Sequence, residues 1–139
     1  MFTAKVYRVM VGSLSGAMEE VYVAKETIRK WNQQNAECTG KVFMPIEWSS
    51  EPAIIQNVDV VVGIIDNWLD NPIIIENSIE ACKKVMLFFK AINNPANTIF
   101  GELEEVQSFK KRNDFQCFWA DYYQLTDLCT LLYDQLEEY

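Results

Sequence analysis

The stretch VDVVVGIIDNWLDNPIIIENSIEACKKVMLFFK, residues 58–90, contains two nearly continuous apolar runs with a more polar segment between them. The runs 58–66 and 84–89 are rich in β-branched and aromatic residues, and neither alternates strictly between apolar and polar side chains. Such runs are typical of central parallel strands that are covered by helices on both faces. The segment between them is long enough for a short helix, so residues 58–90 predict a strand–helix–strand unit.

The rest of the chain continues this alternation. Further strands are predicted at 4–12, 41–48 and 115–120, further helices at 17–34, 99–112 and 121–138, and a single helical turn within 49–57. Pro45 marks the second strand as an edge strand or a bulge. Strands that alternate with helices imply right-handed crossovers and a parallel sheet. We therefore predict one α/β domain over residues 1–139, a flavodoxin-like three-layer sandwich with a five-stranded parallel sheet in the order 2-1-3-4-5.

The composition excludes several classes of function. A nucleic-acid binder needs a basic stripe, but the chain has 12 Lys and Arg against 20 Asp and Glu, for a net charge of −8. A small anionic ligand remains compatible, because it can dock on backbone N–H groups. The chain has no histidine, so any catalysis has to use Asp, Glu, Tyr, Lys or Cys. We expect no metal and no cofactor.

The sequence also predicts a compartment. No apolar run reaches the ~18 residues of a membrane-spanning helix, and no signal-peptide pattern opens the chain. The four cysteines form no C-x-x-C pair and are expected to be buried or half-buried free thiols: Cys38, Cys82, Cys117 and Cys129. These features predict a soluble cytoplasmic protein without a membrane partner.

The predicted strand order locates a candidate ligand site. In sheets of this kind ligands bind outside the carboxyl ends of the strands, where the strand order reverses between strands 1 and 3. The residues expected there are Gly12, Ser13, Leu14 and Ser15 after the first strand, and Asp66, Asn67 and Trp68 after the third. The run GSLSG (12–16) could present N–H and hydroxyl groups to an anion, or it could be a plain loop with Ser15 as the helix N-cap. Asp66 is either a turn residue or a ligand contact.

Glu76 is the candidate catalytic residue, and its setting depends on where the helix between strands 3 and 4 begins. A start with Asn71 as N-cap and Pro72 as the first helical residue makes Glu76 part of the first helical turns. A start at Asn77, with Glu80 completing a capping box, leaves Glu76 at the mouth of the site. In that case the preceding isoleucines, 73–75, would shield the carboxylate from water and raise its pKa. The sequence alone does not choose between the two.

The aromatic residues Trp119, Tyr122 and Tyr123 follow or end the last predicted strand. Because no basic residues are interleaved with them, we expect packing near the carboxyl edge of the sheet rather than a platform for stacking bases.

Several motifs resemble, in order, those of family 4062 of the bacterial domains of unknown function. YRVMVGSLSGAMEEVYVAKETIRKWN (7–32) is similar to the opening of that family, with serines 13 and 15 in the loop, Glu20 in the acidic position and Trp31-Asn32 near the helix end. PIEW (45–48), VDVVVGIIDNW (58–68), IENSIEACKKVMLFFK (75–90) and ELEEVQSFKKR (102–112) resemble its later elements. The chain departs from the pattern at Val21, which replaces a basic residue, and in the shortened segment 69–75.

That family is in turn similar to TIR domains and nucleoside deoxyribosyltransferases. The resemblance implies a nucleotide- or nucleoside-like ligand, and it implies that Glu76 attacks or stabilises the anomeric carbon while an N-glycosidic bond breaks. A carboxylate can do this without histidine, since it stabilises or captures an oxocarbenium-like centre.

Three functions follow as hypotheses. The first is a nucleotide-binding TIR-like domain that cleaves an N-glycosidic bond through Glu76. The second is a non-catalytic relative that senses or sequesters such a ligand, for instance in bacterial or phage defence signalling, and the shortened segment 69–75 favours it over turnover. The third is a protein-interaction module that forms homo-oligomers through its acidic surface and C-terminal helix.

Overall fold

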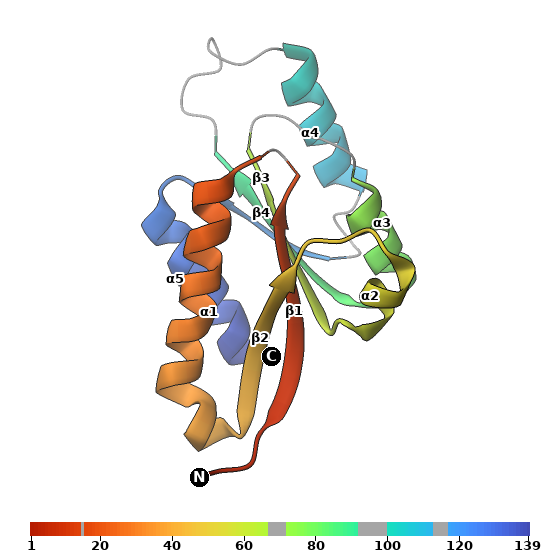
Figure 1. The fold of residues 1–139 in the computed structure, drawn as a ribbon. Helices are drawn as coiled ribbons and strands as arrows, with labels where there is room; N and C mark the ends of the chain where they lie inside the picture. The colour runs from red at the N-terminus through yellow and green to blue at the C-terminus, as the bar shows by residue number, and fades with distance from the viewer. Residues whose placement is uncertain (15, 67–71, 92–99, 113–116) are drawn as a thin grey trace.

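The computed structural model describes residues 1–14, 16–66, 72–91, 100–112 and 117–139, and Figure 1 shows their arrangement. Strands and helices alternate along the whole chain. They are β1 (Lys5–Ser13), α1 (Met18–Thr39), β2 (Lys41–Glu47), α2 (Pro52–Asn57), β3 (Val60–Ile65), α3 (Ile73–Glu80), β4 (Lys84–Lys90), α4 (Phe100–Arg112), β5 (Phe118–Tyr122) and α5 (Leu125–Glu138).

The five strands form one sheet in the order β2-β1-β3-β4-β5, and every neighbouring pair is parallel. The predicted sheet and strand order are therefore confirmed. β2 is an edge strand, as Pro45 indicated, and Pro45 pairs with Val9 of β1. β3 lies at the centre and all six of its residues are buried, which explains its continuous apolar sequence.

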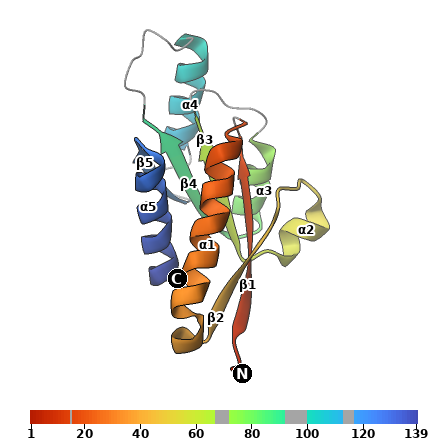
Figure 2. The same cartoon turned by 60° about the vertical axis from the view of Figure 1, so that its left-hand side comes forward.

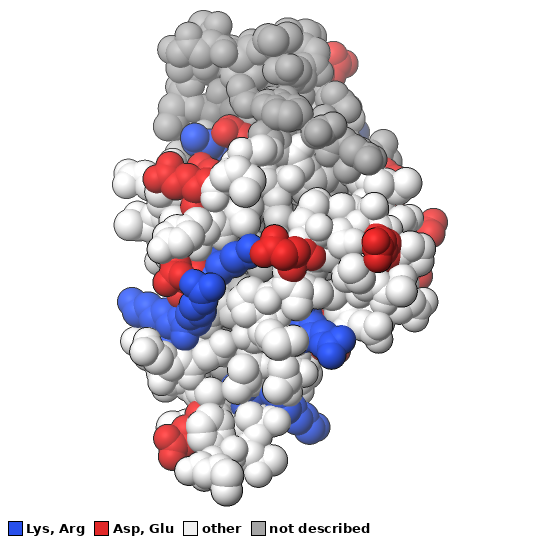
Figure 3. Space-filling view, in the orientation of Figure 1, with Lys and Arg blue, Asp and Glu red and all other residues white. Residues whose placement is uncertain are grey.

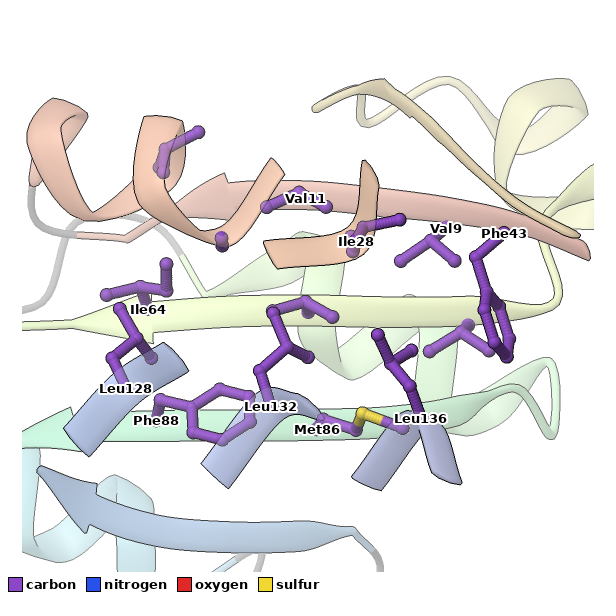
Figure 4. Close-up of a cluster of buried hydrophobic side chains, with 14 of the residues drawn as sticks. Val9, Val11, Ile28, Phe43, Ile64, Met86, Phe88, Leu128, Leu132 and Leu136 are labelled. Carbon is purple, nitrogen blue, oxygen red and sulfur yellow. The ribbon is translucent and has the colours of Figure 1, made fainter. Parts of the chain in front are cut away.

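Helices cover both faces of the sheet, as Figures 1 and 2 show: α1 and α5 lie on one face, and α2, α3 and α4 on the other. Each face has its own apolar core. The α1/α5 core includes Val11, Ile64, Phe88, Leu128 and Leu132, and several of these side chains are drawn in Figure 4. The α3 core is built around Met10, Ile65, Ile75, Leu87 and Phe109. Alternate residues of each strand serve alternate cores, as the period of a β-strand requires.

Some element boundaries differ from the predicted ones. α1 runs to Thr39, five residues beyond the prediction, and stops where Gly40 adopts a left-handed conformation with φ 68°. β5 begins at Phe118 and extends to Tyr122, so the closing helix starts only at Leu125. A capping box between Gln124 and Asp127 defines that start.

The cysteines are all free thiols, but the prediction that each is buried or half-buried is wrong for two of them. Cys38 and Cys82 are exposed, because they lie at the ends of α1 and α3, whereas Cys117 and Cys129 are half-buried. Among the described helices, none is long and apolar enough to cross a membrane.

Candidate functional site at the carboxyl edge of the sheet

The site is at the end of the sheet where all five strands terminate, toward the top in Figure 1. α1 leaves β1 toward one face and α3 follows β3 on the opposite face, while β1 and β3 are adjacent. A strand pair whose helices diverge in this way is the position where ligands bind in open α/β sheets. The switch point is therefore where the sequence predicted it, between the carboxyl ends of β1 and β3.

Four polar side chains end the strands on the α1/α5 face of the sheet. Each follows the last core residue of its own strand on that face by two positions. The four are Ser13 of β1, Asp66 after β3, Lys90 of β4 and Tyr122 of β5. We call these residues the edge row. β1, β3, β4 and β5 are consecutive in the sheet, Lys90 is level with Tyr122, and Ser13 is level with Ile64, two residues before Asp66.

Ser13 holds the loop that leads into α1. Its hydroxyl donates to the carbonyl of Ile64 at 3.1 Å and accepts from the backbone N–H of Ala17 at 2.9 Å. Gly16 completes the turn with φ 76°, a conformation that glycine adopts without strain. Ser13 therefore joins β1, β3 and the beginning of α1. The N-cap of α1 is Ala17, so the prediction of Ser15 as N-cap is wrong, and the ligand contact of this loop stays a prediction.

Gly12 faces the other side of the sheet, where the indole of Trp48 lies against it. A Cβ atom at Gly12 would be 2.3 Å from Cδ2 of Trp48 and 2.4 Å from Cγ. The structure gives this glycine a packing role, and its predicted ligand contact stays a prediction. Leu14, also expected near the ligand, is buried in the α3 core.

Asp66 and Lys90 form an ion pair within the edge row, with 3.9 Å between Oδ2 and Nζ. Both side chains are partly exposed, so the pair contributes little to stability and its charges remain accessible. Glu20, in the first turn of α1, is half-buried above the same face of the sheet.

Tyr122 closes the edge row and is the most deeply buried member. Its side chain is 1% exposed, and within the described part of the chain its hydroxyl has no hydrogen-bond partner. Burial is the largest cause that raises the pKa of Tyr122, and the negative charges of Glu20 and Asp66 raise it further. The phenol therefore stays protonated and can donate a hydrogen bond.

Glu76 is in the first turn of α3, which begins after Pro72, and its N–H donates to the Pro72 carbonyl at 3.1 Å. Of the two alternatives, the start at Asn77 is wrong, because residues 73–76 are already helical. The early start is observed one residue later than predicted, with Pro72 as N-cap and Ile73 as the first helical residue. Ile74 and Ile75 point into the α3 core, so they do not cover the carboxylate, and Glu76 is exposed. It lies across the sheet from the edge row, because α3 packs on the opposite face.

Three predicted ligand residues, Ser15, Asn67 and Trp68, lie outside the described residues. Lys90 and Tyr122 were not predicted as site residues. Of the aromatic group assigned to packing, Tyr122 is buried and Trp119 packs against the α3 core, whereas Tyr123 is 61% exposed. Among the described residues, no cluster of three acidic or cysteine side chains could hold a metal ion.

A separate groove of about 590 Å³ lies away from the edge row, between α1 and α5. Tyr22, Thr27 and Lys30 line it from α1, and Cys129, Tyr133 and Asp134 line it from α5. On the face drawn in Figure 3, acidic and basic side chains of the described residues are interspersed, and Lys25 pairs with Glu47 at 2.9 Å.

No protein-family model and no curated protein matches this chain. Solved structures do match its fold. A short-chain flavodoxin associated with a non-canonical PDU bacterial microcompartment is 7% identical, with a TM-score of 0.53, and the match covers 96% of this chain and 97% of the flavodoxin. Homoserine dehydrogenase of S. aureus is 11% identical, with a TM-score of 0.51, and the match covers 84% of this chain. This chain spans only about a third, 33%, of that dehydrogenase. The likeness shows the α/β flavodoxin-like fold, and at these identities it shows the fold alone.

Proposed function

We propose that this protein binds a nucleoside- or nucleotide-like ligand at the carboxyl edge of the sheet, between the ends of β1 and β3. The observation that carries the proposal is the edge row, in which Ser13 and Asp66 end the two strands of the switch point and Lys90 of the next strand pairs with Asp66. Polar groups converging at this position of an open α/β sheet are what a small polar ligand requires. The resemblance to nucleoside-processing families supplies the ligand class.

The catalytic form of the proposal assigns Glu76 to cleavage of an N-glycosidic bond. α3 runs away from the carboxyl edge, so its first turn, which contains Glu76, is at the same end of the sheet as the edge row. A ligand bound at the carboxyl ends of β1 and β3 could extend toward either face. The exposure of Glu76 favours binding over turnover, since a carboxylate that stabilises an oxocarbenium-like centre works best where water is excluded.

The test separates binding from turnover. Purified protein and the variants Glu76→Gln and Glu80→Gln would be incubated with NAD, nucleosides and deoxynucleotides, and released base would be quantified by chromatography. Glu80 is also an exposed carboxylate and lies at the other end of the same helix, so it is the matched control. Release that only Glu76→Gln abolishes supports catalysis. A ligand-dependent rise in melting temperature without release supports a binding domain, and no response to any ligand contradicts the proposal.

A second candidate function, assembly with another copy of this chain, is favoured by the groove between α1 and α5. Tyr22 beside the groove is 64% exposed, and Met18 one turn earlier is 71% exposed. Lys30 on one wall and Asp134 on the other form no ion pair within the described part of the chain. In a two-fold symmetric pair, Lys30 of each copy can meet Asp134 of the other.

Sedimentation of the ligand-free protein tests this second function. A dimer that Lys30→Glu and Asp134→Lys each dissociate, and that the double variant restores, would support it, because the swap re-creates the charge pairs. A monomer at all concentrations would rule it out.

A further inference from the structure

β2 is an edge strand, so one side of its backbone faces away from β1. Backbone polar groups alternate in direction along a strand. The carbonyl of Gly40 accepts from the N–H of Lys5 in β1 at 2.8 Å, which means that the even-numbered residues of β2 face β1. The odd-numbered residues therefore present their N–H and C=O groups away from the sheet, and we call this row of groups the outer edge of β2. Such a row is ordinarily a template on which another strand can pair.

The outer edge has its hydrogen-bond donors closed at positions 41, 43 and 45. At Lys41 the N–H donates to the hydroxyl of Thr39 at 3.2 Å. At Phe43 the side-chain amide of Asn32 takes both groups: the N–H donates to Oδ1 at 2.9 Å, and the carbonyl accepts from Nδ2 at 2.7 Å. At Pro45 there is no N–H to donate. A strand placed alongside β2 would therefore meet no available N–H at these positions.

The contact of Asn32 has the form of a strand pairing. A side-chain amide offers one acceptor and one donor, the same combination that a neighbouring strand supplies in a ladder. α1 packs along β2, and the residue before Asn32, Trp31, is anchored in the α1/α5 core with its Nε1 donating to Glu137 at 3.1 Å. The packing of α1 therefore holds the amide against the outer edge.

Without this protection the strand would favour association. Met44 of β2 is 40% exposed, and Val6 of the neighbouring strand is 55% exposed. Exposed apolar side chains beside unpaired backbone groups invite pairing with another chain, and proline or charged residues on an edge strand oppose it. The last residue of β2, Glu47, adds such a charge, because its carboxylate is exposed and pairs with Lys25 of α1 at 2.9 Å.

We propose that Asn32 and Pro45 keep the outer edge of β2 closed to strand pairing with a second copy of this chain. The contact that they exclude is β2 against β2, in which a two-fold axis makes the two strands antiparallel and joins two sheets into one. The inference concerns a surface that includes neither the edge row nor the groove between α1 and α5, so it stands independently of the proposed function.

Sedimentation velocity of the full chain tests the proposal with Asn32→Ala, Pro45→Val and the double variant. Asn32→Ala removes the strand-like contact, and Pro45→Val restores the missing N–H. Asn35→Ala is the matched control, because Asn35 is also half-buried on α1 and loses its two hydrogen bonds, to Trp31 and Tyr133, without touching β2.

Each of these proteins would also carry Asp134→Lys, so that assembly through the groove between α1 and α5 does not enter the comparison. We expect the double variant to dimerise with a dissociation constant at least tenfold lower than that of Asn35→Ala. Each single variant should associate less than the double variant, because one of the two positions stays closed. Hydrogen–deuterium exchange of the segment 41–47 should slow in the double variant as the protein concentration rises.

A further variant separates the amide from the loss of packing. Asn32→Asp combined with Pro45→Val keeps an acceptor for the N–H of Phe43, so it should associate no more than Pro45→Val alone. Association as strong as that of the double variant with alanine would overturn the role of the Asn32 amide. If Asn32→Ala does not fold, Pro45→Val alone decides, because it opens one donor in an otherwise intact edge: dimers with slowed exchange of 41–47 support the proposal, and a monomer overturns it.

Three other results would overturn the proposal. The first is a double variant that is folded and remains monomeric. The second is equal association of Asn35→Ala, which would mean that lower stability alone causes it. The third is a dimer in which exchange of the segment 41–47 does not depend on concentration, because the contact would then lie elsewhere.

Discussion

The two faces of the sheet are built differently, although both are apolar. On one face α1 and α5, of 22 and 14 residues, cover the strands, whereas α2, α3 and α4 on the other have 6, 8 and 13. On the α1/α5 face Tyr122 is buried, whereas on the other face Glu76 in the first turn of α3 is exposed. The comparison teaches that a carboxylate at a helix start is not enough to define a site.

The largest effect is expected from Leu132→Ala on the α1/α5 face. Leu132 is 0% exposed, so its truncation leaves a cavity and should lower the free energy of unfolding by about 2–5 kcal/mol. Ile79→Ala of α3 removes a similar volume from a half-buried position and should cost less than half as much. Urea denaturation of both variants measures the difference. Equal losses would mean that the α3 face is as tightly packed as the other, contrary to the comparison.

The second-largest loss of stability is expected at Gly12, which packs against Trp48 on the α3 face of the sheet. Gly12→Ala places a Cβ atom 2.3 Å from an indole carbon, and overpacking of this kind costs about 1–3 kcal/mol. In a Trp48→Ala background most of that loss should disappear, because the atom that clashes is gone. Denaturation of the single and double variants forms a double-mutant cycle. A loss of ligand binding that persists in the Trp48→Ala background would instead identify Gly12 as a ligand contact.

The fold was predictable from the sequence because apolar periodicity reports burial directly. The runs at 58–66 and 84–89 mark strands covered on both faces, and the alternating helices fix their parallel order. The positions of Ser13 and Asp66 at the carboxyl edge were also predictable, since each comes at the end of an apolar strand. Their contact with a ligand stays a prediction.

Tyr122 could not be assigned from the sequence, since the predicted last strand ended at residue 120 and the closing helix began immediately after it. The strand in fact continues to Tyr122, and its pairing with Lys90 aligns the phenol with the edge row. The sequence did contain a sign that the strand continues to Tyr122, because Phe118, Ala120 and Tyr122 alternate along it and share one face. That the phenol lacks a partner depends on tertiary packing, which sequence spacing does not report.

The pH dependence of the free energy of unfolding is a further test of the contrast between the two faces. Tyrosine in the unfolded chain ionises near pH ~10, while burial and the charges of Glu20 and Asp66 raise the pKa of Tyr122 in the fold. The native state therefore holds a proton that the unfolded state loses, and stability present below pH ~10 should fall by up to about 1.4 kcal/mol per pH unit above it. Denaturation between pH 9 and ~11.5 should show a shallower decline for Tyr122→Phe. Parallel curves for the two proteins would mean that the native phenol ionises normally.

The smallest effect is expected from Glu76→Gln, the change that tests the other face. Glu76 is exposed in the first turn of α3, where a negative charge interacts favourably with the helix macrodipole, so its loss should lower the free energy of unfolding by no more than about 0.5 kcal/mol. Glu80→Gln in the last turn should be neutral or slightly stabilising, because a negative charge is unfavourable there. Thermal denaturation of both variants at low salt gives the sign of each change. A loss above about 1 kcal/mol for Glu76→Gln alone would show that its carboxylate holds the structure together, since a surface charge rarely contributes so much. Loss of function in that variant could then no longer be assigned to chemistry.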